Sequence, residues 1–246
     1  ENDGYGSDSS LRHLVDRLNA ETGDDTYAYI DADSNTGQTN ALGTDAIKVG
    51  MLYKPATVTP IGQTAVLNTT EFVGGGDTAP RSRPSLAQAF RVNATGGSFV
   101  ADVNHLKSKG SACTVPDALD GQGNCNASRT VSAQALATWL DTDPTGTGEK
   151  DVLILGDLNS YAMEDPITVL KNAGYTNLVS SFLGEDAYSY VFDGQWGYLD
   201  HALGSADLFG KNQVAGVAEF HINADEPSVL DYDTDFKTAN LQDVLY

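Results

Sequence analysis

The sequence lacks the features that would mark a membrane protein or a thiolate-bound metalloprotein. No run approaches the roughly eighteen apolar residues that a membrane-spanning helix needs, and the first residues do not form a signal peptide. We expect no membrane partner, and we expect any export signal to have been removed. Only two cysteines occur, and no second Cys or His pair lies at ligand spacing, which argues against zinc.

Positive charge is also scarce. The 246 residues carry 14 Lys and Arg against 34 Asp and Glu, which gives a formal net charge of −20 and a pI of about 4.2. This acidity suits a secreted or salt-tolerant setting and argues against passive adhesion to nucleic acid or anionic lipid. We find no repeat and no interdomain linker, and a hydrophobic content of 40% suffices for a core. We expect residues 1–246 to form a single domain.

Basic residues nevertheless gather in one part of the chain. Residues 81–129 contain six Lys and Arg against three Asp, whereas the rest of the chain is strongly negative. A basic strip on an acidic body is what a phosphate-processing enzyme would need, because it attracts a polyanion. Metal ions would also be required to let a polyanion approach.

The two cysteines predict a disulfide. Cys113 and Cys125 are separated by eleven residues rich in Gly, Asp and Asn, a segment with little core of its own. A disulfide that closes this loop would contribute about 3 kcal/mol in the chain-entropy model. It implies an oxidising compartment, hence a secreted, extracellular protein or a periplasmic one. The alternative is a pair of free thiols in a flexible loop.

Hydrophobic periodicity predicts a layered α/β sandwich. Apolar residues at helical spacing follow a Ser-rich start and predict a helix over residues 9–21. Residues 86–92 and 98–105 are typical of a hairpin of core strands, and residues 66–82 of a long loop. We further expect helices over residues 129–140 and 166–172, and strands over residues 27–30, 46–54, 151–155, 188–192 and 198–203.

Three apolar segments end in, or contain, polar residues typical of an active site. Asp157 and Asn159 follow a predicted buried strand, His105 ends another, and Asp200 is embedded in a third. Titratable groups in apolar segments are costly to desolvate unless a partner or a metal compensates. Gly156 would leave space for a phosphate or metal. The alternative for Asp157 and Asn159 is an Asx-turn at the strand end.

With these motifs in place, the chain resembles the endonuclease/exonuclease/phosphatase superfamily, which includes deoxyribonuclease I. It looks closest to large secreted bacterial nucleases. The resemblance implies a four-layer α-β-β-α sandwich. The matching segments run in the family order along nearly the whole chain: Glu1-Asn2-Asp3-Gly4-Tyr5-Gly6, Lys54-Pro55, Arg83-Pro84-Ser85-Leu86-Ala87, Asn104-His105-Leu106-Lys107-Ser108-Lys109-Gly110, Gly156-Asp157-Leu158-Asn159-Ser160 and Gly197-Tyr198-Leu199-Asp200-His201-Ala202-Leu203.

The resemblance also implies hydrolysis of a phosphodiester by in-line attack of water beside a divalent cation. In that scheme Asp157 binds the metal and positions or deprotonates the water. Asn159 holds the phosphate or the water through its amide. His105 contacts the scissile phosphate or protonates the leaving oxygen, a step that suits an imidazole at neutral pH.

Three basic residues become candidates for binding the substrate. The resemblance implies that Arg83 contacts the DNA backbone, and that Lys107 and Lys109 do the same. The alternative is that all three are ordinary solvated side chains near a loop.

The chain departs from the family pattern at both ends. The resemblance implies that Asp200 orients a second histidine carried by a terminal Ser-Asp-His motif, and no such motif follows His201. The metal-binding Glu of the family should stand two residues before Glu1. We therefore expect a piece of a longer protein, inactive by itself and lacking the first strands and last strand of the fold. The alternative is a degenerate homologue.

The leading hypothesis is a secreted, monomeric, metal-dependent nuclease acting on DNA, with RNA as an alternative substrate. We expect Mg²⁺ or Mn²⁺ in catalysis and consider Ca²⁺ for a structural role. Within the same fold, the alternative is a phosphomonoesterase or a lipid phosphodiesterase. A non-catalytic acidic module that binds calcium or a matrix polymer is a third reading, although no Asp-x-Asp-x-Asp-Gly loop occurs.

Overall fold

A six-stranded mixed sheet forms the centre of the protein. The structure is a computed structural model that describes residues 4–192, 194–210, 214–221 and 224. The expected acidic tail lies largely outside the described residues, as do Glu1, Asn2 and Asp3. The sheet consists of β3 (Val58–Leu67), β4 (Ser85–Val92), β5 (Ser98–His105), β6 (Val152–Asp157), β7 (Tyr175–Asn177) and β10 (Asp200–Ser205). Their order across the sheet is β3-β4-β5-β6-β10-β7. The neighbours β5 and β6 run parallel, and the other neighbouring pairs of this sheet are antiparallel.

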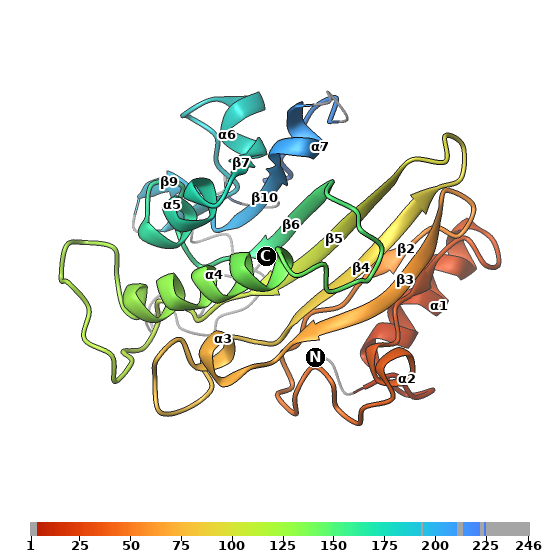
Figure 1. Cartoon of the computed structure of the whole chain (residues 1–246), viewed down its shortest axis with the longest axis horizontal. Helices are drawn as coiled ribbons and strands as arrows, with labels where there is room; N and C mark the ends of the chain where they lie inside the picture. Colours follow the sequence, from red (N-terminus) through yellow and green to blue (C-terminus); the bar gives the residue numbers. More distant parts are fainter. Residues whose placement is uncertain (1–3, 193, 211–213, 222–223, 225–246) are drawn as a thin grey trace, which may run out of the picture.

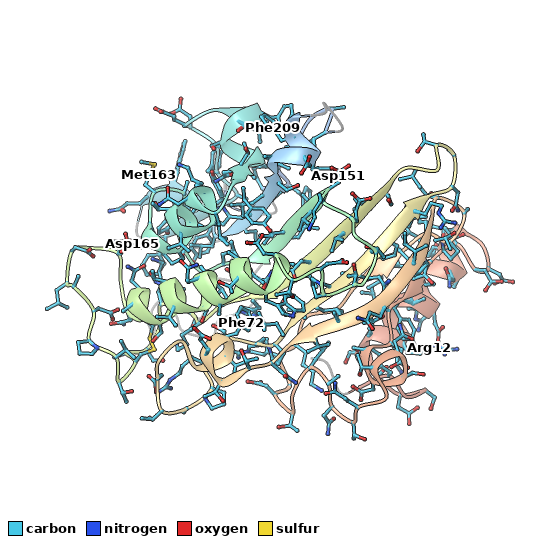
Figure 2. All side chains as sticks on the ribbon, in the orientation of Figure 1. Arg12, Phe72, Asp151, Met163, Asp165 and Phe209 are labelled. Atoms are coloured by element: carbon cyan, nitrogen blue, oxygen red, sulfur yellow. A yellow bond between two sulfur atoms is a disulfide. The ribbon has the colours of Figure 1, made fainter. Side chains whose placement is uncertain are left out.

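Helices cover one face of this sheet. The helix α4 (Asn126–Leu140) crosses it in front in Figure 1, flanked by α3 (Thr70–Gly74) and α5 (Asp165–Asn172). The apolar residues of α4 and of the strands share one core with Phe72, whose fully buried ring lies beside α4 in Figure 2. The predicted helix over residues 129–140 is confirmed, and it begins three residues earlier.

A smaller set of elements covers the other face. The pair β1 (Ala28–Tyr29) and β2 (Leu52–Tyr53), with α2 (Ala32–Thr36), contributes to a second core with the sheet. The helix α1 (Ser10–Thr22) begins at the N-cap Ser9, as the sequence predicted. The expected α/β layering is therefore confirmed, although the second β layer is reduced to the short pair β1–β2 among the elements that the structure describes here.

Three regions differ from the expectation. Of the strand expected over residues 46–54, only β2 at Leu52–Tyr53 is present. The long loop expected over residues 66–82 is wrong, because it contains α3 and the end of the ten-residue strand β3. Because β3 is an edge strand, it tolerates Pro60 and a bulge between Ile61 and Ala65. Both features are typical of turns in a sequence and hide the strand pattern. In the C-terminal region, the strand expected over residues 188–192 is present as β8 (Tyr190–Phe192). Three further short elements were not predicted: α6 (Leu178–Leu183), β9 (Gln195–Gly197) and α7 (Ala206–Gly210).

The register of three neighbouring strands fixes the polar strand ends. His105, the last residue of β5, is aligned with Asp157, the last residue of β6. Asp157 is aligned in turn with Asp200, the first residue of β10. Residues aligned across neighbouring strands project to the same face of a sheet. The three side chains therefore form a row across β5, β6 and β10.

Gly156 has a different role from the expected one. It adopts φ +119°, and a Cβ atom there would lie 2.1 Å from the carbonyl oxygen of Asn104. The space beside Gly156 is thus filled by the backbone of β5 and is not open to a phosphate or metal. The glycine allows β5 and β6 to approach each other at the end that carries the row.

We predict that Gly156→Ala lowers the free energy of unfolding by about 3 kcal/mol or more, because neither the backbone conformation nor the Asn104 carbonyl can accept a methyl group. Urea unfolding followed by circular dichroism measures the change. Gly110→Ala is the matched control, since a Cβ at Gly110 would contact nothing within 4 Å. Equal unfolding midpoints for the two variants would contradict this reading of the strand approach.

A buried carboxyl lies on the α4 face of β5. Asp102 is fully buried and accepts hydrogen bonds of 2.5 Å from the Ser85 hydroxyl and from the Asn104 amide. Burial raises its pKa to about 7, with the two hydrogen bonds opposing the shift. Because an unfolded Asp titrates near 3.9, the folded protein holds a proton between about pH 4 and pH 7 that the unfolded chain has lost. This group therefore weakens the fold as pH rises through that window.

We predict that Asp102→Asn gains stability relative to the parent as pH rises from about 4 to 7, by up to about 1.4 kcal/mol per pH unit. The Oδ1 atom of Asn104 is buried without a hydrogen bond, so an amide flip can accept from the new side chain. Chemical denaturation at several pH values measures the difference between parent and variant, in which other titrating groups cancel. The control is the exposed Asp24→Asn. A pH-independent difference for Asp102→Asn would show that the carboxyl stays ionised.

Candidate active site

His105 and Asp157 are in contact at the end of the sheet. The Nε2 atom of His105 lies 3.7 Å from the Oδ2 atom of Asp157, and each side chain keeps about a third of its surface exposed (27% and 34%). Asp200 stands opposite Asp157 on the next strand. A partly exposed imidazole beside a carboxylate can exchange protons with a bound reactant.

Electrostatics at the row favour a cation. Burial raises the pKa of Asp157, and the neighbouring Asp200 carboxylate raises it further, against the hydrogen bond from the Asn159 backbone and the charge of His105. Burial likewise raises the pKa of Asp200, although part of this side chain is exposed. Two adjacent carboxylates with raised pKa values repel each other, and a cation bound beside them would remove that repulsion.

Asn159 forms the Asx-turn that the sequence analysis gave as the alternative for this motif. Its backbone N–H donates to Asp157 Oδ1 at 2.8 Å, which is an Asx-turn. The residue has φ +48°, so the chain is no longer extended there. Its buried side-chain amide donates to the Leu106 carbonyl at 2.9 Å and ties the turn to the end of β5. The turn thus holds the Asp157 carboxylate in place.

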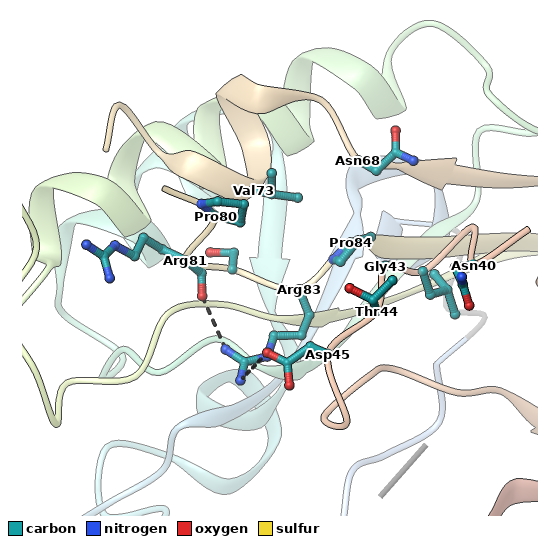
Figure 3. Close-up of a pocket in the computed structure, with 12 residues that line it drawn as sticks. Asn40, Gly43, Thr44, Asp45, Asn68, Val73, Pro80, Arg81, Arg83 and Pro84 are labelled. Atoms are coloured by element: carbon teal, nitrogen blue, oxygen red, sulfur yellow. Dashed lines mark hydrogen bonds and ion pairs between the residues drawn. The ribbon is translucent and has the colours of Figure 1, made fainter. Parts of the chain in front are cut away.

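Arg83 extends the row on the side of β4. Its backbone N–H donates to the His105 carbonyl at 2.9 Å. Its guanidinium contacts Asp45 Oδ2 at 3.3 Å and donates to the Arg81 carbonyl at 3.2 Å, as Figure 3 shows. The side chain lines a cavity of about 490 Å³ and is 19% exposed. Arg83 is therefore the member of the predicted substrate-binding set that borders the row directly.

The two predicted substrate-binding lysines are engaged elsewhere. The ammonium group of Lys107 is hydrogen-bonded to Ser108 and Ser111. Lys109 forms an ion pair of 2.5 Å with Glu164. Burial lowers the pKa of both lysines. Both ammonium groups are therefore occupied by acceptors from the surrounding loops. The basic strip predicted from the sequence largely makes contacts within the protein.

His201 is a structural residue, because it alternates with Asp200 along β10 and faces away from the row. The side chain is 3% exposed, its Nε2 lies 2.7 Å from the Ser160 carbonyl, and its Nδ1 lies 3.4 Å from the Asn177 amide. Burial lowers its pKa to about 4, so the imidazole is neutral at physiological pH. His201 links β10 to the turn that follows β6.

The predicted disulfide between Cys113 and Cys125 is present, with the two Cα atoms 5.3 Å apart. The loop that it closes begins α4, because the Asp117 carboxylate accepts from the backbone N–H groups of Cys125 and Ala127 at 2.7 and 3.0 Å. These bonds satisfy donors at the helix start that have no partner within the helix. The loop and the helix are thereby built as one unit.

Arg129 is the residue whose role the sequence concealed. It counted toward the basic strip, but its side chain is completely buried. The guanidinium donates to the Lys107 carbonyl, the Ser160 hydroxyl and the Asn124 carbonyl at 3.1, 3.1 and 2.7 Å. It therefore joins the segment after His105, the segment after Asn159 and the disulfide loop. No local sequence pattern distinguishes such an arginine from an exposed one.

The residues present fit a magnesium-type ion, although no group of three or more His, Cys, Asp or Glu in the described part of the chain forms a ready metal cluster. Mg²⁺ is usually held by one or two carboxylates, with waters and substrate phosphates completing its shell. Asp157 and Asp200 supply two carboxylates with mutual repulsion. This donor set suits a hard cation and does not suit zinc.

Solved structures with this fold are known. The human Nocturnin catalytic domain with bound sulfate superposes with a TM-score of 0.52 at 14% identity, covering 81% of this chain and 65% of that chain. An endonuclease/exonuclease/phosphatase family protein from Bacteroides thetaiotaomicron gives 0.50 at 14% identity, covering 83% and 80%. One from Bacteroides vulgatus gives 0.50 at 15%, covering 78% and 69%. This chain thus spans less than two thirds of the Nocturnin domain.

The comparisons establish the fold expected from the sequence motifs, that of the endonuclease/exonuclease/phosphatase proteins. At the sequence level, no protein-family model and no curated protein matches the chain. No helix in the described ranges has the length and apolar character needed to cross a bilayer.

We predict that Arg129→Met lowers the free energy of unfolding by about 3 kcal/mol or more, since several buried acceptors lose their donor. Guanidinium chloride denaturation measures this loss. Arg91→Met is the control, because Arg91 is exposed on β4 and its replacement should change stability by less than about 0.5 kcal/mol. If both variants unfold at the parent's midpoint, Arg129 does not hold the loops together.

Proposed function

We propose that this protein is a secreted, divalent-metal-dependent phosphodiesterase whose substrate is DNA. The observation that carries the proposal is the row of His105, Asp157 and Asp200, with 3.7 Å between the His105 and Asp157 side chains. The fold supports it, because nuclease and phosphatase chemistry is named in the family of two structures that share it. The sulfate in the Nocturnin structure is a tetrahedral dianion of phosphate shape.

Each residue of the row has a chemical task in this proposal. Asp157, held by the Asn159 turn, orients the attacking water and accepts its proton. His105, whose partly exposed imidazole lies beside Asp157, contacts the scissile phosphate or donates a proton to the leaving oxygen. Asp157 and Asp200 would hold the divalent cation, which supplies electrostatic stabilisation of the charge that builds on the phosphate oxygens.

Substrate orientation follows from the position of Arg83. Its guanidinium is anchored by Asp45 and by the Arg81 carbonyl, while its backbone N–H is hydrogen-bonded to the His105 carbonyl. A planar, fixed guanidinium is suited to a phosphate of the backbone. The acidic body repels a polyanion everywhere else, so binding depends on this site and on the cation.

The test is nicking of plasmid DNA by the full-length protein that contains this chain, in Mg²⁺ or Mn²⁺. We predict that Asp157→Ala and His105→Ala each lower the rate by on the order of 10²–10⁴-fold, because each removes proton transfer or water positioning. His13→Ala, a change at an exposed histidine of α1, should leave the rate unchanged. EDTA should abolish nicking by the parent.

Parallel assays separate the other hypotheses. Turnover of a phosphate monoester without nicking would reject the nuclease and favour a phosphatase of the same fold. Equal inertness of the parent and the two site variants on all phosphoesters would favour a binding module. Loss of activity in His13→Ala as well would show that the lower rates come from misfolding of the variants and not from loss of the side chains of the row.

A further inference from the structure

A second cavity lies beside the row, on the side opposite Arg83. It has a volume of about 660 Å³, within the range of roughly 300–1,000 Å³ typical of small-molecule sites. Its walls come from the loop around Lys109, from the segment that follows β6, and from the β8–β9 hairpin. Asn159 and Leu199, neighbours of Asp157 and Asp200 in the chain, line it. The three residues of the row do not line the cavity themselves, so it adjoins the proposed reaction site through Asn159 and Leu199.

Aromatic rings form part of this cavity. The rings of Tyr190 and Phe192 lie nearly parallel, at 12°, with their centres 6.4 Å apart, and both are exposed (41% and 63%). Tyr161 lines the wall and is fixed from two sides. A Cβ at Gly197 would lie 2.8 Å from its ring, and the Lys109 ammonium lies 5.2 Å from the ring centre. Pre-positioned rings can stack on a flat ligand with little loss of conformational entropy.

The charges of this cavity cancel within it. Lys109 and Glu164 both line it and bind each other at 2.5 Å. The remaining polar side chains of the lining are neutral: the amides of Asn124, Asn159 and Gln195, and the hydroxyl groups of Ser108, Tyr161 and Tyr190. A neutral lining with aromatic faces and amide groups does not suit a phosphate. It suits a neutral, flat heterocycle with hydrogen-bonding edges.

We propose that this cavity binds a nucleobase of the nucleotide adjacent to the phosphate under attack, by stacking on Tyr190 and Phe192. The inference rests on the proposed function, since the row supplies the phosphate site next to which the base would lie. Stacking on aromatic faces tolerates every base, so the cavity confers affinity for single-stranded or frayed nucleic acid without sequence preference. Phosphate monoesters and phospholipid headgroups carry no base and would gain nothing from it.

The experiment compares two probes that carry the same backbone charge. One is a single-stranded oligothymidylate, and the other is an equally long oligomer of abasic tetrahydrofuran residues, each labelled at one end. Fluorescence anisotropy in Mg²⁺, with His105→Ala in every protein so that the probes are not cleaved, gives their affinities for the full-length protein and its variants. Hydrolysis of the same probes is measured separately in Mg²⁺.

We expect Tyr190→Ala and Phe192→Ala each to weaken binding of the oligothymidylate roughly 5- to 150-fold, the range that corresponds to the stacking of one base. Binding of the abasic probe should not change. Trp196→Ala is the matched control, because this exposed aromatic residue belongs to the same hairpin but does not line the cavity. Trp196→Ala should bind both probes like the parent.

The outcomes separate the two proposals. Equal affinity of the parent for both probes, or an equal loss for both in Tyr190→Ala and Phe192→Ala, would overturn the base site even if the parent hydrolyses DNA. Base-dependent binding without hydrolysis by the parent would overturn the nuclease and leave the base site standing as a nucleic-acid binding pocket. A loss in Trp196→Ala equal to that in Phe192→Ala would assign the effect to the hairpin fold and also overturn the base site.

Discussion

The backbone ladder that joins β5, β6 and β10 is the constraint on which the site depends. It sets His105, Asp157 and Asp200 in one register, so that segments separated by as many as ninety-five residues place their side chains on one face. A shift of one residue in any of these strands would turn its polar end into the opposite face. The close approach at Gly156 makes this register specific, because a larger residue there would collide with β5.

Around this ladder, two basic side chains hold loops together, whereas two carboxylates remain for the proposed chemistry. Arg129 and Lys109 are neutralised by carbonyl groups and by Glu164, and so hold the loops behind the row. Asp157 and Asp200 remain uncompensated by comparison, with pKa values raised by burial. The net result is a negative site on a negative protein. Such a site favours binding of a cation, and a bound cation would in turn attract an anion.

The sequence predicted the row because each residue stands at the end of, or within, an apolar run, and strand ends meet at one edge of a sheet. The disulfide and the buried His201 were predictable for equally local reasons, namely spacing and alternation. Contacts between distant segments could not be predicted from the sequence. Nothing near Arg129 indicates that carbonyl groups far along the chain would bury it. The strand β3 was not predicted because Pro60 and a bulge are tolerated only at an edge of a sheet. That position is known only once the complete sheet is known.

The disulfide loop has a consequence for the maturation of the protein. Its carbonyl groups accept from Lys109 and Arg129, and its Asp117 starts the helix that covers the sheet. One wall of the aromatic cavity is therefore organised by a covalent bond that a reducing cell does not maintain. Oxidation of Cys113 and Cys125 therefore does more than tie down a loop, because it fixes residues that line the cavity proposed as the base site.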